Sequence, residues 1–241
     1  MKLKDKVAIV TGVAMGIGRA MAEGLASEGA SIVIADIAKA DLAAQEMQRK
    51  EFKAMGVKVD VAAEDDTKRM AAETVKAFGR IDILVNNAGI YTSLLPGPFE
   101  KIPVEEWRRV MDVNVMGMFL CCKAVVGEMK KNKSGRIINV SSGTPFKGIP
   151  YLLHYTTSKG AVVALTRALA KELGGDNILV NAIAPGFTLS AGVLANETQL
   201  KHFREVSAKA RTLVRDEHPE DLVGAVKFFG MLVSHQSSGL G

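Results

Sequence analysis

The chain has 241 residues, of which 48% are hydrophobic and 24% are charged, and its formal net charge is +5. This composition is ordinary for a globular protein and excludes a mainly disordered or collagen-like chain. The Lys and Arg residues are spread along the chain, apart from KKNKSGR at 130–136, so we expect no nucleic-acid partner.

Short β-branched runs alternate with longer helical patterns along the chain. The first half predicts strands at 6–10, 31–35, 53–59 and 82–86 and helices at 17–28, 39–50, 66–78 and 104–131. The second half predicts strands at 136–141 and 178–184, a helix at 151–173, an irregular or loosely helical segment at 187–215 and a final helix at 219–233. Such alternation is typical of βαβ units. We therefore expect a single doubly wound α/β domain of the Rossmann type over 1–241, with a mostly parallel sheet and helices on both faces.

Several classes of segment are missing from this pattern. The start, MKLKDKVAIVTG, lacks the apolar run and cleavage site of a signal peptide. No stretch reads as long and apolar enough to span a membrane. Cys121 and Cys122 are neighbours in an apolar helical run, which favours small core residues over a disulfide. We expect a cytoplasmic protein. The four histidines show no metal-ligand spacing, so no metal site is predicted.

A glycine-rich turn, TGVAMGIG at 11–18, connects the first strand to the first helix. Gly12 permits a tight turn, Gly16 lets a pyrophosphate approach the backbone, and Gly18 lets helix and strand pack closely. The helix N-terminus adds free N–H groups and a positive dipole end. The turn, with Met15 and Ile17 between its glycines, therefore predicts a dinucleotide-binding site.

Asp36 ends the second strand, about 20 residues after this turn, where an acid that binds the adenosine ribose is expected. A carboxylate there accepts hydrogen bonds from ribose hydroxyls and repels a 2′-phosphate. Neither Ile37 nor Met15 is basic, so all three positions favour NAD over NADP. The alternative for Asp36 is a helix N-cap or a solvated loop acid.

Tyr155 and Lys159 lie one helical turn apart in HYTTSKGA, so their side chains rise from the same face. By itself this spacing also fits a half-buried Tyr beside a solvated Lys. The motifs TGVAMGIG, NNAG at 86–89, Asn114 in NVMG, INVSS at 138–142, YTTSK at 155–159 and PG at 185–186 remove that ambiguity. These motifs occur in the order that is typical of the short-chain dehydrogenases/reductases, and the chain resembles that family from residue 6 to about 240.

The resemblance implies hydride transfer between NAD(H) and a secondary alcohol or ketone. It implies that Tyr155 is the general acid/base and that Ser142, thirteen residues earlier, holds the substrate oxygen. Lys159 would lower the pKa of the Tyr155 phenol and hold the nicotinamide ribose. Asn114 would connect Lys159 to solvent through a water.

The resemblance also implies further cofactor contacts. Asn86, Asn87, Ala88 and Gly89 would line the cofactor, Asp60 and Val61 would meet the adenine, and Pro185, Gly186 and Thr188 would meet the nicotinamide end. Ser190 stands where the family often has Thr. The chain ends in SSGLG, where the family's last strand should begin, so we expect that strand to be absent.

The substrate is expected in a mostly apolar pocket, which suits a hydrophobic or aromatic arm. The expected lining is Tyr91, Leu94, Thr144, Phe146, Tyr151, Leu152 and the covering segment 187–215. One alternative function is a 3-oxoacyl-carrier-protein reductase, with 130–136 as a docking site for an acidic carrier. Another is a non-catalytic NAD-binding regulatory protein. The apolar surface of the helices at 104–131 and 151–173 predicts a homodimer or homotetramer.

Overall fold

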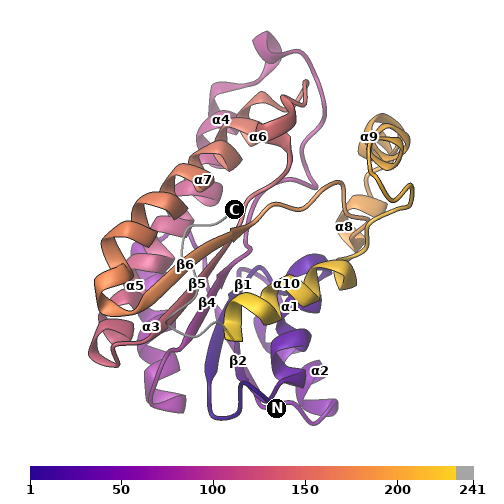
Figure 1. Ribbon diagram of the computed structural model, residues 1–241. Helices are drawn as coiled ribbons and strands as arrows, with labels where there is room; N and C mark the ends of the chain where they lie inside the picture. Colours follow the sequence, from indigo (N-terminus) through magenta and orange to yellow (C-terminus); the bar gives the residue numbers. More distant parts are fainter. Residues whose placement is uncertain (232–241) are drawn as a thin grey trace.

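A six-stranded, wholly parallel sheet forms the centre of the computed structural model, which describes residues 1–231 (Figure 1). The strand order is β3-β2-β1-β4-β5-β6. The strands are β1 (Val7–Thr11), β2 (Ser31–Asp36), β3 (Ala54–Lys58), β4 (Ile83–Asn86), β5 (Gly135–Val140) and β6 (Ile178–Ile183). The order reverses between β1 and β4, and ligands of such sheets bind at this switch point, beyond the carboxyl ends of the strands. The predicted doubly wound fold is confirmed.

One face of the sheet is covered by α1 (Gly16–Ser27), α2 (Ala40–Arg49) and α10 (Val223–Met231). Alternate strand residues such as Val10 and Ile34 pack there against helix residues such as Leu25. Successive residues of a strand point to opposite faces, so their neighbours belong to the other layer.

The opposite face is covered by α3 (Glu64–Phe78), α5 (Gly117–Lys131) and α7 (Leu153–Leu173) (Figure 1). Ile9 and Val33 pack in this layer with Cys121 and Val125 of α5. Cys121 and Cys122 are both buried and free, as expected. Because both faces of the sheet are buried, its strands read as nearly continuous apolar runs.

The predicted helix at 104–131 is one continuous helix with an irregular middle. It runs from α4 (Val104–Met111) through a π-helical turn, η2 (Asp112–Met116), into α5. A π-turn carries one extra residue and often marks a functional position. Here it contains Asn114, which is fully buried.

This helix corrects one expectation from the sequence. Val104–Lys131 has 28 residues and a mean hydropathy of 1.6 in its most apolar window, which suffices by length and composition to cross a membrane. However, 44% of that window is buried inside the fold, and Val110, Cys121 and Met129 are completely buried. Its apolar character is therefore that of a core helix.

The segment at 187–215 is more regular than the sequence pattern predicted. It contains α8 (Ala191–Leu194) and α9 (Glu197–Lys209), which project beside the carboxyl end of β6 (Figure 1). The Asn196 side chain caps α9 by accepting a hydrogen bond from the Gln199 N–H at 3.0 Å. This N-cap, with Glu197 in the first turn, is the start signal that the expectation of an irregular segment overlooked.

Short helices complete the connections. They are η1 (Phe99–Lys101), α6 (Thr144–Lys147), η3 (Gly174–Asp176) and η4 (Pro219–Leu222). The predicted final helix at 219–233 corresponds to η4 followed by α10. Residues 232 and 233, and the expected absence of a last strand after them, lie outside the described residues.

Candidate active site

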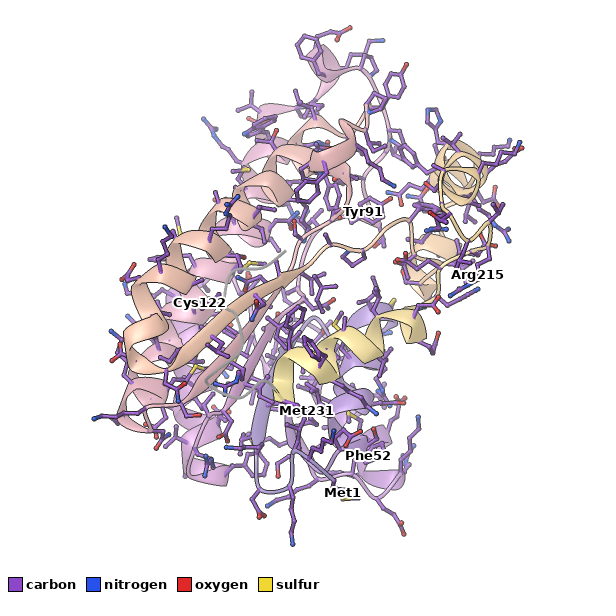
Figure 2. All side chains as sticks on the ribbon, in the orientation of Figure 1. Met1, Phe52, Tyr91, Cys122, Arg215 and Met231 are labelled. Atoms are coloured by element: carbon purple, nitrogen blue, oxygen red, sulfur yellow. The ribbon has the colours of Figure 1, made fainter. Side chains whose placement is uncertain are left out.

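A cavity of about 310 Å³ opens at the carboxyl end of the sheet. The glycine-rich turn forms one end, and α6, the start of α7 and the inner side of α9 form the other. Tyr91, which lines it, lies between α7 and the arm formed by α8 and α9 (Figure 2). The cavity therefore joins the predicted dinucleotide turn to the predicted reacting residues.

The glycine-rich turn requires its glycines for physical reasons. Gly12 and Gly16 have φ of 69° and 66°, in the left-handed region that favours glycine. A Cβ on Gly18 would lie 2.3 Å from the Gly12 carbonyl oxygen and 2.4 Å from Asn87 Nδ2. No side chain caps the start of α1. Its first N–H groups are therefore available to an anion, as a pyrophosphate site requires.

Asn87 braces this turn from β4. Its Nδ2 donates hydrogen bonds to the carbonyl oxygens of Thr11 at 3.0 Å and Gly12 at 2.8 Å. Asn87, Ala88 and Gly89 line the cavity. Asn86 is not among the lining residues, and its side chain turns into the fold and donates to Asn139 Oδ1 at 2.9 Å. The expected contact of its backbone with the cofactor stays a prediction.

Asp36 lies beside the same turn and is almost fully buried. Its Oδ2 accepts a hydrogen bond from Ala14 N at 2.9 Å, and its Oδ1 accepts from Ala38 N at 3.0 Å and Lys39 N at 3.3 Å. The carboxylate thus ties the glycine-rich turn to the turn after β2. As the buried last residue of β2, Asp36 is not the solvated loop acid of the alternative, and Lys39 is the N-cap of α2. The contact of Asp36 with a ribose stays a prediction.

The residues predicted to meet the adenine lie outside the main cavity. Asp60 accepts a hydrogen bond from Ala62 N at 2.9 Å through its side chain. Val61 is buried and packs against Gly117 of α5. Both follow β3, on the same side of the sheet switch point as Asp36.

Tyr155 and Ser142 meet inside the cavity. Tyr155 stands in the first turn of α7 and is 7% exposed. Ser142 Oγ accepts a hydrogen bond from Thr144 N at 3.2 Å, and the Ser142 hydroxyl is hydrogen-bonded to the Tyr155 phenol. Because an amide N–H only donates, the Ser142 proton is free to point to the phenol oxygen. The Tyr91 ring packs against Tyr155 with centroids 4.6 Å apart.

Burial controls the ionisation of the pair. It raises the pKa of the Tyr155 phenol to about 12, while the hydrogen bond from Ser142 acts in the opposite direction. Burial lowers the pKa of the Lys159 ammonium to about 8. The protein's own groups therefore do not produce the expected lowering of the Tyr155 pKa, because desolvation of a phenolate outweighs the Ser142 hydrogen bond.

Asn114 has protein partners for its amide. Its Oδ1 accepts from Ile90 N at 2.7 Å, and its Nδ2 donates to Ile90 O at 3.2 Å and to Ser158 Oγ at 3.1 Å. It thereby fixes the loop after β4 to α7, next to Lys159 on the helix. Asn114 itself does not line the cavity, so the water link to Lys159 stays a prediction.

The substrate end of the cavity agrees only partly with the expected lining. Tyr91, Thr144 and Leu152 line it. Leu94 is buried in a small apolar cluster with Val110. Phe146 and Tyr151 are 68% and 50% exposed and are not among the lining residues.

Lys147 at the end of α6 and Ile149 just after it line the cavity and were not predicted. The expected segment 187–215 contributes Phe187 and, on α9 and just after it, Phe203, Val206 and Ala210. The spacing of 203, 206 and 210 is the helical signal that could have revealed this wall.

The loop after β6 is fixed to the segment that follows α9. Glu217 Oε1 accepts hydrogen bonds from Gly186 N at 3.1 Å and Thr188 Oγ1 at 2.5 Å. Arg211 donates to the Phe187 carbonyl oxygen at 2.8 Å. Pro185, Gly186 and Thr188 line the cavity, as does Ser190, which a Cβ on Gly16 would approach to 3.0 Å. Ser190 thus lies against the glycine-rich turn.

Within residues 1–231, no group of three or more His, Cys, Asp or Glu side chains is arranged to hold a metal ion. His154 is buried, with Nε2 3.1 Å from Glu106 Oε1.

Comparisons with known proteins agree with this site. Residues 6–201 match the family described as short chain dehydrogenase. The chain is 36% identical to the 3-oxoacyl-[acyl-carrier-protein] reductase of Synechocystis, covering 94% of this chain and 89% of that one. The 3-ketoacyl-(acyl-carrier-protein) reductase from Brucella melitensis complexed with NADH has a TM-score of 0.89 at 31% identity, covering 98% of this chain and 95% of that one. NAD⁺-bound xylitol dehydrogenase has a TM-score of 0.92 at 32% identity, covering 99% and 97%.

Proposed function

The chain belongs to the short chain dehydrogenase family, and from this premise we propose that it interconverts a secondary alcohol and a ketone with NAD(H), using Tyr155 as the acid/base. It is an oxidoreductase that uses a nicotinamide dinucleotide. The observation that carries the proposal is the Ser142–Tyr155 pair beside buried Lys159, in one cavity with the glycine-rich turn.

The residues present fit a dinucleotide. A Cβ at Gly12 or Gly18 would collide with the backbone of Ala88 or Gly12, so the glycines keep this turn tight. The uncapped start of α1 that follows offers N–H groups to the pyrophosphate. We assign three parts of the cavity to the cofactor. They are the glycine-rich turn with Met15 and Ile17, the residues Ala88, Gly89 and Lys159, and the loop residues Pro185, Gly186 and Thr188. When bound, the nicotinamide exchanges a hydride with the substrate carbon.

Tyr155 and Ser142 act on the substrate oxygen. With its pKa raised to about 12, the Tyr155 phenol is protonated at neutral pH, which is the form that gives a proton to a carbonyl oxygen. Ser142 donates a second hydrogen bond to that oxygen and fixes its position. Oxidation needs the phenolate. Lys159, with a pKa of about 8, carries the positive charge at neutral pH that favours it.

We propose a preference for NAD over NADP because of the surroundings of Asp36. Its carboxylate is buried at the end of β2 and would repel a 2′-phosphate on a ribose bound there, and Met15 and Ile37 are exposed and uncharged. Lys39, exposed two residues further on, is the nearby cation that would oppose this preference. Asp60 and Val61, which follow β3, are assigned to the adenine of the cofactor.

A 3-oxoacyl-carrier-protein reductase is the second candidate, favoured by the names of the Synechocystis and Brucella relatives. The basic segment 130–136 gives this reading little support. It lies at the end of α5 and the start of β5, opposite the carboxyl ends of the strands where the cavity opens. Lys130 and Lys131 also pair with Asp176 and Glu128.

Turnover assays test the proposal. Ketones and secondary alcohols, together with a 3-oxoacyl thioester, are supplied with NADH or NADPH, or with their oxidised forms, and absorbance at the nicotinamide band is followed. We expect turnover of at least one ketone or alcohol. Tight cofactor binding without turnover of any compound would favour the non-catalytic regulatory alternative. A cytoplasmic location remains a prediction.

A further inference from the structure

Lys147 is a cation that lines the substrate end of the cavity and has no acidic partner among the described residues. It is the last residue of α6 and is exposed to solvent. The other charged residue of the lining is Lys159, whose Nζ donates to the Val140 carbonyl oxygen at 2.7 Å. Of the described residues that line the cavity, none is Asp or Glu. The lining therefore carries only positive charge.

The position of Lys147 separates it from the glycine-rich turn. Its Cε lies 4.0 Å from the point where a Cβ would stand on Gly143, the residue after Ser142. The loop that carries it is fixed at its start: Gly143 N donates to the Pro185 carbonyl oxygen at 2.9 Å, and Thr144 N donates to Ser142 Oγ at 3.2 Å. The Lys147 side chain thus passes near Gly143, the residue after Ser142, whose hydroxyl is assigned to the substrate oxygen.

The walls next to Lys147 are apolar. Ile149, Leu152, Phe203 and Val206 line this end of the cavity. An ammonium beside apolar walls, with no carboxylate to neutralise it, suits a ligand that has an apolar body and an anionic group. A carboxylate and a phosphate both have this chemistry.

We propose that Lys147 binds an anionic group of the substrate, so that the enzyme acts on a keto or hydroxy compound that carries a carboxylate or a phosphate. This rests on the proposed function, because it names the substrate class of the same site. Lys147 is here a specificity-determining residue that takes no part in proton transfer.

Two matched pairs of probes distinguish a substrate carboxylate from a substrate phosphate. Acetoacetate and its methyl ester differ by the carboxylate. Acetoacetyl-CoA and acetoacetyl-N-acetylcysteamine are both thioesters, and only the first carries phosphates. Reduction of each probe is measured for the wild type, Lys147→Gln and Lys147→Glu. Lys171→Gln is the matched control, because Lys171 is exposed at the far end of α7.

We expect Lys147→Gln to lower kcat/KM at least about tenfold for the anionic member of one pair, since a charge-assisted hydrogen bond is lost. The kcat/KM for the uncharged member of that pair should be unchanged. Lys147→Glu should lower kcat/KM for the anionic member further, and Lys171→Gln should behave as wild type. A loss confined to acetoacetate identifies a carboxylate, and one confined to the CoA ester identifies a phosphate.

Three outcomes would overturn the proposal. Unchanged kcat/KM for both anionic probes in Lys147→Gln would remove the role of Lys147 and leave the proposed function intact. A tenfold weaker NADH affinity of Lys147→Gln, measured by fluorescence titration, would make Lys147 a cofactor ligand instead. No turnover of any probe by the wild type with either cofactor would reject the proposed function together with this inference.

Discussion

The Lys159 ammonium donates a hydrogen bond to the Val140 carbonyl oxygen at 2.7 Å and lies 5.8 Å from the centre of the Tyr155 ring. The end of β5 therefore holds this buried cation directly, independently of any ligand. Val140 is the last residue of β5, and Ser142 follows two residues later, so one strand end positions both partners of Tyr155. Such an arrangement costs stability, because a buried charge loses its hydration.

Replacing Lys159 by Met should reveal this cost as a pH dependence. Burial lowers the pKa of Lys159 from 10.5 to about 8, which corresponds to about 3 kcal/mol. Below pH 8 the residue is protonated in both the folded and the unfolded protein, and the full penalty applies. Between about pH 8 and 10.5 the unfolded chain binds more protons than the folded one, so the stability of the wild type rises with pH.

The measurement is the free energy of unfolding of wild type and Lys159→Met, from denaturant titrations between pH 6.5 and 10.5. We expect the free energy of unfolding of the wild type to rise relative to that of the variant as pH rises above 8. Below pH 8 the difference between the two free energies should not change with pH. The unpaired Val140 carbonyl in the variant adds an offset that does not depend on pH. A difference that stays constant over the whole range would contradict the buried-cation account.

Two glycines should respond in opposite ways to alanine. A Cβ on Gly18 would meet the backbone of Gly12 at 2.3 Å, so Gly18→Ala should disrupt the turn, weaken NAD binding at least about tenfold and lower stability. Gly127 lies inside α5 with no atom within 4 Å of an added Cβ. Gly127→Ala should therefore raise the free energy of unfolding by about 0.5–1 kcal/mol. Thermal unfolding and NADH fluorescence titration test both, and equal effects of the two variants would refute this argument.

Local patterns were sufficient to predict the parts of the site that lie on one element. The left-handed backbone of Gly12 and Gly16 is a local property of one turn, and the Tyr155–Lys159 spacing reflects one turn of α7. The contacts of these glycines with Ala88 and Ser190 had no such local signal. The parallel sheet with helices on both faces followed from the alternation of strands and helices, whereas the strand order β3-β2-β1-β4-β5-β6 was not predicted. These predictions needed only short-range geometry.

Predictions failed where a side chain's direction depends on distant elements. Tyr151 lies close to Ser142 in sequence, but its φ of 70° turns the chain, and its ring packs edge-on against His202 of α9 at 5.6 Å. The protein partners of the Asn114 amide, Ile90 and Ser158, were likewise not foreseen, because its place on a π-turn has no local sequence signal. Neither the π-turn nor the position of α9 is encoded in a local periodicity, so these contacts could not be read in advance.

We expect the cofactor preference to depend on Asp36. We expect kcat/KM with NAD(H) to exceed that with NADP(H) at least tenfold, about 1.4 kcal/mol. Asp36→Ser should reduce this ratio, since it removes the charge that repels a 2′-phosphate. It should also lower stability by about 1–3 kcal/mol, because the N–H groups of Ala14 and Ala38 lose their acceptor.

Steady-state kinetics with both cofactors measure the effect. Asp41→Ser is the matched control, because Asp41 is exposed in the first turn of α2. Any increase in kcat/KM with NADPH in Asp36→Ser should disappear when Lys39→Ala is added, if Lys39 is the cation that attracts the 2′-phosphate. An equal or higher kcat/KM of the wild type with NADPH would refute the assignment of Asp36 as the residue that disfavours NADP.

Assembly should depend on the outer side of the helix at 104–131. Val104, Met116 and Phe119 are exposed there, which supports the prediction of a homodimer or homotetramer. Phe119→Glu should shift the protein toward monomer in light scattering at micromolar concentration. Phe228→Glu changes an exposed aromatic residue on α10, on the other face of the sheet, and should leave at least a dimer. A monomeric wild type would refute the prediction.

Tyr155→Phe provides the most direct test of the reaction. The substitution keeps the ring that packs on Tyr91 and removes only the hydroxyl that meets Ser142. Activity should fall at least about 10²-fold, the lower end for general acid–base catalysis, and NAD binding should survive. Lys159→Ala should lower both turnover and cofactor affinity. The double variant should lose less than the product of the two single losses, because both residues serve one proton transfer.

The pH profile distinguishes the two directions of this reaction. In the protein alone the pKa of Tyr155 is about 12, so reduction, which needs the protonated phenol, should not lose activity through Tyr155 up to pH 9. Oxidation needs the phenolate and should rise with pH, and with the positively charged nicotinamide of the oxidised cofactor bound beside charged Lys159 its kinetic pKa should lie well below that of free tyrosine. In Lys159→Ala that kinetic pKa should move upward, since the positive charge is gone. Turnover against pH in both directions, for wild type and both single variants, is the measurement. Near-normal turnover of Tyr155→Phe would leave Tyr155 and Lys159 as an ordinary buried pair on α7.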